Sequence, residues 1–363
     1  MFEAPFYHLR RPLSNFYRAI QSKSVTVGFI GGSITDSRSR AKWSDVIIRE
    51  FCARYPDVSI QVVNAAIGGT DSIHGVFRAE KDLVPYNCDL IFIEYAVNDA
   101  ALETQLRNRS REGLIRKLWR PDCDLVLTYT FERPMLEDML ALRLPASIAE
   151  LEDIAEHYQI PSVFMGCYAL DCLKRGLLRW EEWLPDGLHP DSCGSRYYAA
   201  PVIKMMEEAA AQTNAPAYVL PGPMFAHQME TASRLPFSQI RRSGYWFIQH
   251  PIDTTLVDTM LSTSALGSYL EFSFEGTGVV ICTSWGTCAA DYRWKVDDGP
   301  WQVSQLSRPD LPDWPGKWGW TRTNLLADHL EPGVHQLHIE PCLHQSEDCK
   351  GINFDLCYIG ILP

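Results

Sequence analysis

The chain has 363 residues, which is long for a single hydrophobic core and predicts two domains. Its formal net charge of −12 argues against a protein that binds nucleic acid or an anionic membrane through a broad basic surface. No apolar run is long enough to cross a bilayer, and the first ten residues lack the apolar core of a signal peptide. We therefore expect a cytoplasmic protein.

Between residues 25 and 212, short apolar runs alternate with stretches of helical periodicity. The first run, 25–30, leads into Gly31, Gly32 and Ser33, where small side chains let the backbone turn sharply. Such alternation predicts a parallel sheet with helices on both faces, preceded by an N-terminal arm or short helix. The other expected strands are 60–66, 90–95, 125–130 and 161–165, and the expected helices are 43–55, 73–83, 103–119, 146–158 and 195–212.

The pattern changes after residue 213. A Pro-rich stretch, 214–223, has no helical periodicity and is typical of a linker. Beyond it the apolar runs are short and alternating, which predicts an antiparallel, jelly-roll-like β-sandwich over 224–363 after an α/β domain over 1–213. The expected strands of the second domain are 270–274, 278–282, 292–296, 334–339 and 354–361.

Four polar stretches follow predicted elements of the first domain, and together they hold the parts needed for acyl transfer. Ser33 can act as the nucleophile, and His189 can take its proton because imidazole ordinarily titrates near neutral pH. Asp186, three residues earlier, can orient that imidazole. The backbone N–H groups of Ser33 and Gly69 and the side-chain amide of Asn98 can donate to an oxyanion. Each stretch alone is as well explained by a turn, a helix cap or a structural histidine, whereas the four together indicate a hydrolase site.

In this order and spacing, the four stretches resemble the SGNH (GDSL-like) hydrolase family over about residues 22–212. The resemblance implies a flavodoxin-like three-layer α/β/α sandwich and a serine esterase that works without metal or cofactor. It assigns Ser33, Asp186 and His189 as catalytic residues and Ser33, Gly69 and Asn98 as the oxyanion hole.

Two departures from the commoner family pattern bear on the subfamily and the substrate. Gly32 stands where Asp is more common, giving the Gly-Gly-Ser-Ile-Thr form, and Ala96 stands where Gly is more common before Asn98. Neither change removes a catalytic group.

The substrate class is less constrained than the chemistry. No extended apolar lid is evident near Ser33, and the second domain is rich in tryptophan, so O-acetyl groups on a carbohydrate are the favoured ester. The alternatives are an acyltransferase, a short-chain lipid or thioester hydrolase, or a non-catalytic sugar-binding protein on a hydrolase scaffold. The expected partner is a small-molecule or carbohydrate ester, without nucleic acid or membrane.

A loop at 313–320 carries three tryptophans, more than a solvated loop ordinarily exposes. We expect Trp318 and Trp320 to contact a sugar or to lie near the mouth of the Ser33 site. Packing inside the sandwich core is the alternative explanation for these residues.

Neither a metal site nor a disulfide framework is expected. The eleven cysteines include no CxxC pair, which favours reduced thiols, with Cys282/Cys288 and Cys342/Cys349 as the alternative local bridges. The histidine-rich stretch of the second domain has the wrong spacing to place its ligands on one face of a strand. Its candidate ligands are His335, His338, Cys342 and His344.

Overall fold

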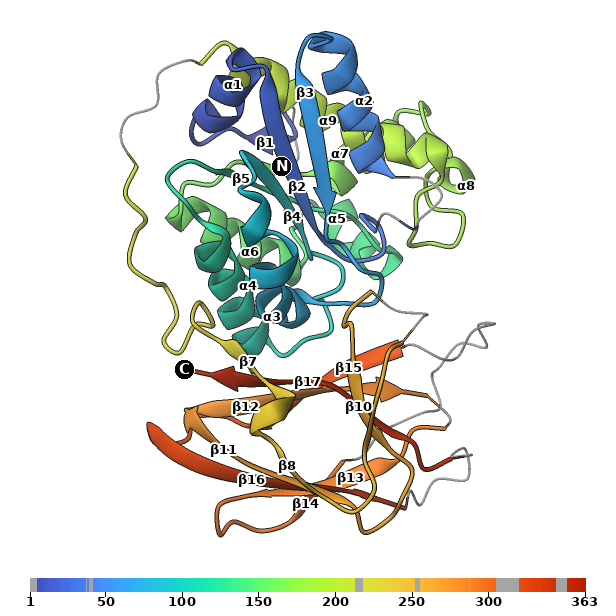
Figure 1. The fold of residues 1–363 in the computed structure, drawn as a ribbon. Helices are drawn as coiled ribbons and strands as arrows, with labels where there is room; N and C mark the ends of the chain where they lie inside the picture. The colour runs from blue at the N-terminus through green and yellow to red at the C-terminus, as the bar shows by residue number, and fades with distance from the viewer. Residues whose placement is uncertain are drawn as a thin grey trace. The chain divides into compact units, whose positions relative to one another are not determined.

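The computed structural model describes residues 5–36, 38, 42–212, 218–251, 255–286, 288–304, 320–343 and 351–363. The chain divides into two compact units, Met1–Glu230 and Thr231–Pro363. Figure 1 shows the elements of each unit. Within the described ranges, no helix has the length and apolar character that a membrane span requires.

The first unit is built on a six-stranded sheet of β1 (Tyr7–His8), β2 (Ser24–Gly31), β3 (Ser59–Asn64), β4 (Leu90–Glu94), β5 (Asp124–Thr128) and β6 (Ser162–Val163). The strand order is β1-β6-β5-β4-β2-β3. Strands β2 to β6 run parallel, and β1 pairs with β6 in the antiparallel sense. The parallel part has the flavodoxin-like order, as predicted.

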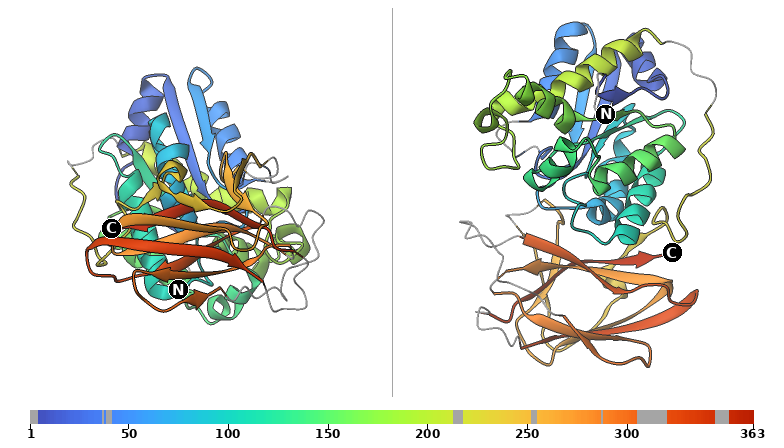
Figure 2. Two further views of the ribbon diagram at one scale, coloured as in Figure 1. Left: turned by 60° about the horizontal axis from the view of Figure 1, so that its bottom comes forward. Right: turned by 180° about the vertical axis from the view of Figure 1, so that it is seen from behind.

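Helices cover both faces of this sheet. On one face, α3 and α6 pack against α4, and on the other α2, α7 and α8 pack against α9 (Figures 1 and 2). This arrangement confirms the predicted three-layer α/β architecture. The helices are α1 (Ser14–Gln21), α2 (Trp43–Arg54), α3 (Ser72–Asp82), α4 (Thr104–Leu118), α5 (Leu136–Leu140), α6 (Ala146–His157), α7 (Met165–Lys174), α8 (Trp180–Trp183) and α9 (Ser192–Ala210).

Three of the predicted apolar strands, 25–30, 90–95 and 125–130, lie at the centre of the sheet as β2, β4 and β5, and the expected strand 60–66 is the edge strand β3. Every residue of β4 and β5 is buried, as expected for strands covered by helices on each side. The strand order reverses between β2 and β4, which is where open α/β sheets bind ligands. Ser33 lies just beyond the carboxyl end of β2, and Asn98 follows β4.

Residues 218–230 belong to the first unit, because side chains of α4 hold their backbone. The buried Glu112 carboxylate accepts hydrogen bonds from the Met224 N–H (2.5 Å) and the Phe225 N–H (2.9 Å). Arg109 donates to the His227 carbonyl oxygen at 2.8 Å. The second compact unit therefore begins at Thr231, whereas the sequence pattern suggested Met224.

The second unit consists of two antiparallel sheets, which confirms the predicted β-sandwich. One sheet has the order β15-β12-β17-β10-β9, with β7 also paired to β17, and the other β14-β13-β16-β11-β8. Apolar side chains from both sheets, among them Ile281, Phe272 and Ile339, form the core. The strands are β7 (Ser233–Leu235), β8 (Arg241–Ser243), β9 (Phe247–Gln249), β10 (Met260–Thr263), β11 (Tyr269–Gly276), β12 (Gly278–Trp285), β13 (Asp291–Val296), β14 (Gln302–Val303), β15 (Trp320–Ala327), β16 (Gly333–Cys342) and β17 (Phe354–Leu362).

Candidate active site

The turn that carries Ser33, residues 32–36, follows β2 without a break and is called the Ser33 turn. The backbone N–H groups of Thr35 and Asp36 both donate to the Gly32 carbonyl oxygen, at 3.2 and 3.0 Å. These bonds fold the chain tightly around Ser33, whose neighbours in the turn are buried while Ser33 itself is partly exposed. The serine is therefore held on a rigid support at the edge of the sheet.

Ser33, His189 and Asp186 form a continuous chain of side-chain contacts. Ser33 Oγ lies 2.8 Å from His189 Nε2, and His189 Nδ1 lies 2.7 Å from Asp186 Oδ2. Because a carboxylate only accepts, the proton of a neutral imidazole belongs on Nδ1, which leaves Nε2 free to accept from the serine hydroxyl. The sequence placed these three residues together, and the structure brings them into hydrogen-bond contact.

Asp186 also shapes the loop that presents His189. Its Oδ1 accepts from the backbone N–H groups of His189 (2.7 Å) and Leu188 (2.9 Å). Burial alone would raise the pKa of the Asp186 carboxyl, but the hydrogen bonds from His189 and Leu188 lower it below its usual value. The carboxylate therefore stays ionised beside the imidazole near neutral pH.

The Asn98 side chain packs directly against the backbone beside Ser33. A β-carbon added to Gly32 would lie 1.9 Å from Asn98 Oδ1 and 2.7 Å from Asn98 Nδ2. Asn98 sits in the loop that follows β4, residues 96–102, here called the Asn98 loop. The amide predicted to donate to an oxyanion thus lies next to the Ser33 turn.

The loop that carries Gly69, residues 67–72, approaches Ser33 from the neighbouring strand β3 and is called the Gly69 loop. A β-carbon on Gly68 would lie 3.3 Å from Ser33 Cβ, so the two backbones are close neighbours. Gly69 has a φ of 75°, a left-handed conformation that glycine adopts without strain. The structure therefore places the Gly69 loop and the Asn98 side chain beside the Ser33 turn.

Glu94, the last residue of β4, is a buried carboxyl that the sequence analysis did not single out. It accepts from Thr130 Oγ1 (2.7 Å) and Thr35 Oγ1 (3.0 Å), and so connects the segment that follows β5 with the Ser33 turn. Burial raises the pKa of Glu94 to about 7; the charge of Asp99 adds to the rise, and the two threonine hydroxyls oppose it. An acid within the apolar run 90–95 was the sequence signal for this residue.

The proposed tryptophan contact lies mostly outside the described residues. Trp318 falls in the undescribed stretch 305–319, while Trp320 is the first residue of β15 and pairs with Trp285, so it does not belong to a loop. β15 was not among the expected strands because its residues lack a clear apolar alternation.

Two of the histidines considered as metal ligands, His335 and His338, have carboxylate partners, and the third, His344, lies outside the described residues. His335 Nδ1 lies 2.7 Å from Asp297 Oδ2, and His338 Nδ1 lies 3.0 Å from Glu271 Oε1. In the part of the chain that the structure describes, no cluster of three or more His, Cys, Asp or Glu residues could hold a metal ion. None of the cysteines in the same ranges forms a disulfide, and Cys349, one of the alternative bridge partners, lies outside them.

Comparison with known proteins gives one family match, within the first unit. Residues 29–197 match the model of the GDSL-like Lipase/Acylhydrolase family. No curated protein sequence matches the chain.

Two solved structures share the two-domain fold. A two-domain esterase (CEX) active on acetylated mannans, co-crystallised with mannopentaose, has a TM-score of 0.80 and 21% sequence identity; the match covers 97% of this chain and 95% of that chain. A second structure of that esterase matches with a TM-score of 0.80 and 21% identity over 97% and 96% of the two chains. A catalytic mutant of an acetylxylan esterase from Geobacillus stearothermophilus matches with a TM-score of 0.44 and 20% identity over 50% and 94%.

The matched range includes Ser33, Gly69, Asn98 and His189. These residues lie at the carboxyl edge of a flavodoxin-like sheet. Residues 29–197, which include the whole candidate site, therefore form a GDSL-like lipase/acylhydrolase domain of this chain.

Proposed function

We propose that the protein removes O-acetyl groups from a carbohydrate through an acyl-enzyme formed on Ser33. The observation that carries the proposal is the unbroken contact chain from Ser33 Oγ to His189 Nε2 and from His189 Nδ1 to Asp186. A nucleophile, a base and a group that orients the base are thereby in hydrogen-bond contact before substrate arrives.

In the first half of the reaction, Ser33 Oγ attacks the acetyl carbonyl carbon while His189 Nε2 takes the hydroxyl proton. Asp186 stabilises the imidazolium that forms and keeps its ring oriented. The carbonyl oxygen becomes an oxyanion, which accepts from the N–H groups of Ser33 and Gly69 and from the amide of Asn98. The C–O bond to the sugar then breaks, and the sugar oxygen leaves with the proton from His189.

In the second half, His189 Nε2 takes a proton from water, whose oxygen attacks the acetyl-Ser33 carbonyl carbon. The same donors stabilise the second oxyanion. When the ester bond to Ser33 breaks, the proton returns from His189 to the serine oxygen and acetate leaves. The cycle consumes one water and uses no metal or cofactor.

The carbohydrate substrate is supported by the two-domain esterase active on acetylated mannans, which matches this chain over 97% of its length. Acetylated manno- and xylo-oligosaccharides should be compared with p-nitrophenyl esters of increasing acyl length, with acetate release as the common readout. We expect the highest kcat/KM on an acetylated sugar. A preference for acyl chains longer than acetyl would point to the lipid or thioester alternative, and acetyl transfer to an added sugar would point to a transferase.

A fluorophosphonate that labels serine hydrolases tests the chemistry independently of the substrate. The unsubstituted protein should be labelled and Ser33→Ala should not. Ser44→Ala, on α2, is the matched control, because it removes a buried serine hydroxyl that has no hydrogen-bond partner among the described residues. No labelling of the unsubstituted protein, combined with binding of a sugar, would support the non-catalytic alternative.

A further inference from the structure

We propose that two carboxylates, Asp36 and Asp99, are positioning residues that hold the Gly69 loop from both ends and so set the oxyanion hole. Both are buried, with exposed fractions of 4% and 0%. Neither belongs to the Ser33–His189–Asp186 contact chain. The proposal rests on the function proposed above, because it concerns the donors that act in that reaction.

Asp36 holds the start of the Gly69 loop. Its Oδ2 accepts from the Gly68 N–H at 2.7 Å, and its Oδ1 accepts from the Arg38 N–H at 2.8 Å. Burial would raise the pKa of Asp36, but the hydrogen bonds from Arg38 and Gly68 lower it below its usual value. A charged acceptor makes a stronger bond to a backbone N–H than a neutral one. The last residue of the Ser33 turn thus fixes the residue immediately before Gly69.

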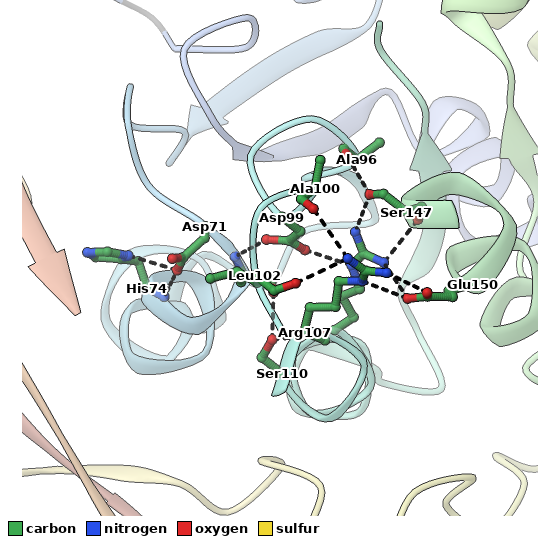
Figure 3. A network of polar contacts seen from close by, with 12 residues as sticks. Asp71, His74, Ala96, Asp99, Ala100, Leu102, Arg107, Ser110, Ser147 and Glu150 are labelled. Atoms are coloured by element: carbon green, nitrogen blue, oxygen red, sulfur yellow. Dashed lines mark hydrogen bonds and ion pairs between the residues drawn. The ribbon is translucent and has the colours of Figure 1, made fainter. Parts of the chain in front are cut away.

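Asp99, labelled in Figure 3, holds the end of the same loop. Its Oδ1 accepts from the Ser72 N–H at 2.8 Å, and its Oδ2 accepts from Arg111 Nε at 2.7 Å. Burial raises the pKa of Asp99, against the opposing effect of the Arg111 charge and of the Ser72 hydrogen bond. The residue immediately after Asn98 therefore fixes the first residue of α3.

Between these two anchors the Gly69 loop is closed on itself. The Thr70 N–H and the Thr70 hydroxyl both donate to the Ile67 carbonyl oxygen, at 3.3 and 2.8 Å. Gly69 lies inside this closed turn in its left-handed conformation. Because the two anchors come from the Ser33 turn and the Asn98 loop, all three sources of oxyanion donors are tied to one another.

The backbone of the Asn98 loop is held by side chains of α4 and α6. Ser147 donates through Oγ to the Ala96 carbonyl oxygen, and Arg111 Nη2 donates to Ser147 Oγ at 2.8 Å. Arg107 Nη1 donates to the Leu102 carbonyl oxygen at 3.1 Å (Figure 3). Contacts at both ends of the loop and at Asp99 leave Asn98 little freedom to move.

This arrangement predicts a specific kinetic effect. Oxyanion donors contribute in the transition state far more than in the ground state, and a displacement of about 1 Å can cost on the order of 10²-fold in rate. Loosening the anchors should therefore lower kcat and leave KM nearly unchanged. A residue that only stabilised the fold would change the melting temperature without this selective loss.

Asp36→Ala and Asp36→Asn form the first test, with p-nitrophenyl acetate as substrate. Asp36→Ala removes the acceptor for the Gly68 N–H, and Arg38 is half-exposed, so no buried cation is stranded. We expect kcat to fall about 10²-fold with KM changed by less than about 2-fold. Asp36→Asn keeps one acceptor oxygen and should recover most of the lost rate. Equal losses in both variants, or a rise in KM alone, would overturn the proposal for Asp36.

Ser147→Ala and Ser162→Ala form the second test, which avoids stranding the buried Arg111. Both serines are buried, and each hydroxyl accepts from an arginine at 2.8 Å. Ser162 lies on β6 beside Arg10, outside the network of Figure 3. We expect similar losses of melting temperature, but about a 10-fold loss of kcat in Ser147→Ala alone. The same kcat in both variants would refute positioning through the Asn98 loop.

Failure of this proposal can be told apart from failure of the esterase mechanism. If Ser33→Ala keeps its activity, the proposed function is wrong. The other outcome is that Ser33→Ala is inactive while Asp36→Ala and Ser147→Ala keep the full kcat. That result would support the serine mechanism and refute the positioning role of the two carboxylates.

Discussion

The Asn98 side chain fills the space that a side chain at residue 32 would need: a β-carbon added to Gly32 would lie 1.9 Å from Asn98 Oδ1. The residue before the serine is Asp in the commoner form of this family, and here no side chain fits unless Asn98 moves. Gly32 is therefore required by the close approach of the Asn98 amide.

Gly32→Ala should displace Asn98 and lower kcat on p-nitrophenyl acetate by about 10²-fold, the cost of weakening one oxyanion donor. Gly222→Ala is the matched control, since a β-carbon there meets nothing within 4 Å. Normal turnover by a folded Gly32→Ala protein would show that the Asn98 amide does not act in the reaction.

Asn98→Ala should lower kcat by about 10²–10³-fold with little change in KM, because the amide acts on charge that develops only in the transition state. Asn98→Asp keeps the size of the side chain but replaces its donor with a carboxylate, so it should lose at least as much activity. A higher KM with an unchanged kcat would instead assign Asn98 to substrate binding.

Asp186→Asn should lower kcat on the order of 10⁴-fold with little structural change. An amide facing His189 Nδ1 favours the imidazole form that carries its proton on Nε2, and that nitrogen then cannot take the proton of Ser33. Asp171→Asn, which removes a partly exposed carboxylate on α7, should retain full activity. Comparable activity of the two variants would remove Asp186 from the mechanism.

Glu94 should make stability depend on pH in the direction opposite to most carboxylates. Its pKa is raised to about 7, so its contribution is fully present below the unfolded value near 4.5 and is lost as the pH rises through 7. The loss is on the order of 3 kcal/mol, since one pKa unit corresponds to about 1.4 kcal/mol.

Denaturant unfolding of the unsubstituted protein and of Glu94→Gln between pH 5 and 8 measures this effect. The difference in free energy of unfolding should shrink as the pH rises, because the glutamine side chain does not titrate. Glu150→Gln is the control, because the pKa of Glu150 is shifted in the opposite direction: burial would raise it, but Arg107 lowers it below its usual value. The difference in free energy of unfolding between the unsubstituted protein and Glu150→Gln should therefore be constant above pH 6 and shrink only towards acid pH. A constant difference for Glu94→Gln over this range would contradict the raised pKa.

Elements with strong local patterns were predicted closely, and elements without them were missed. The runs at 90–95 and 125–130 correspond to β4 and β5, because a strand covered on both faces must be apolar throughout. By contrast, β1 and β14 have two residues each, too few to show any periodicity. They form because β6 and β13 offer unpaired backbone groups to them.

The sequence by itself determined the fold class and which residues would meet, because Ser33, Gly69, Asn98 and His189 follow strands or helices whose ends meet at one edge of a parallel sheet. Only the tertiary structure decided how these residues are held. Asp36 and Gly68 are 32 residues apart, and Asp99 and Ser72 are 27 apart, yet each pair shares a hydrogen bond at the junction of two loops. Such contacts produce no periodic pattern in the sequence. The donors that stabilise a buried carboxylate come close to it only when the chain folds.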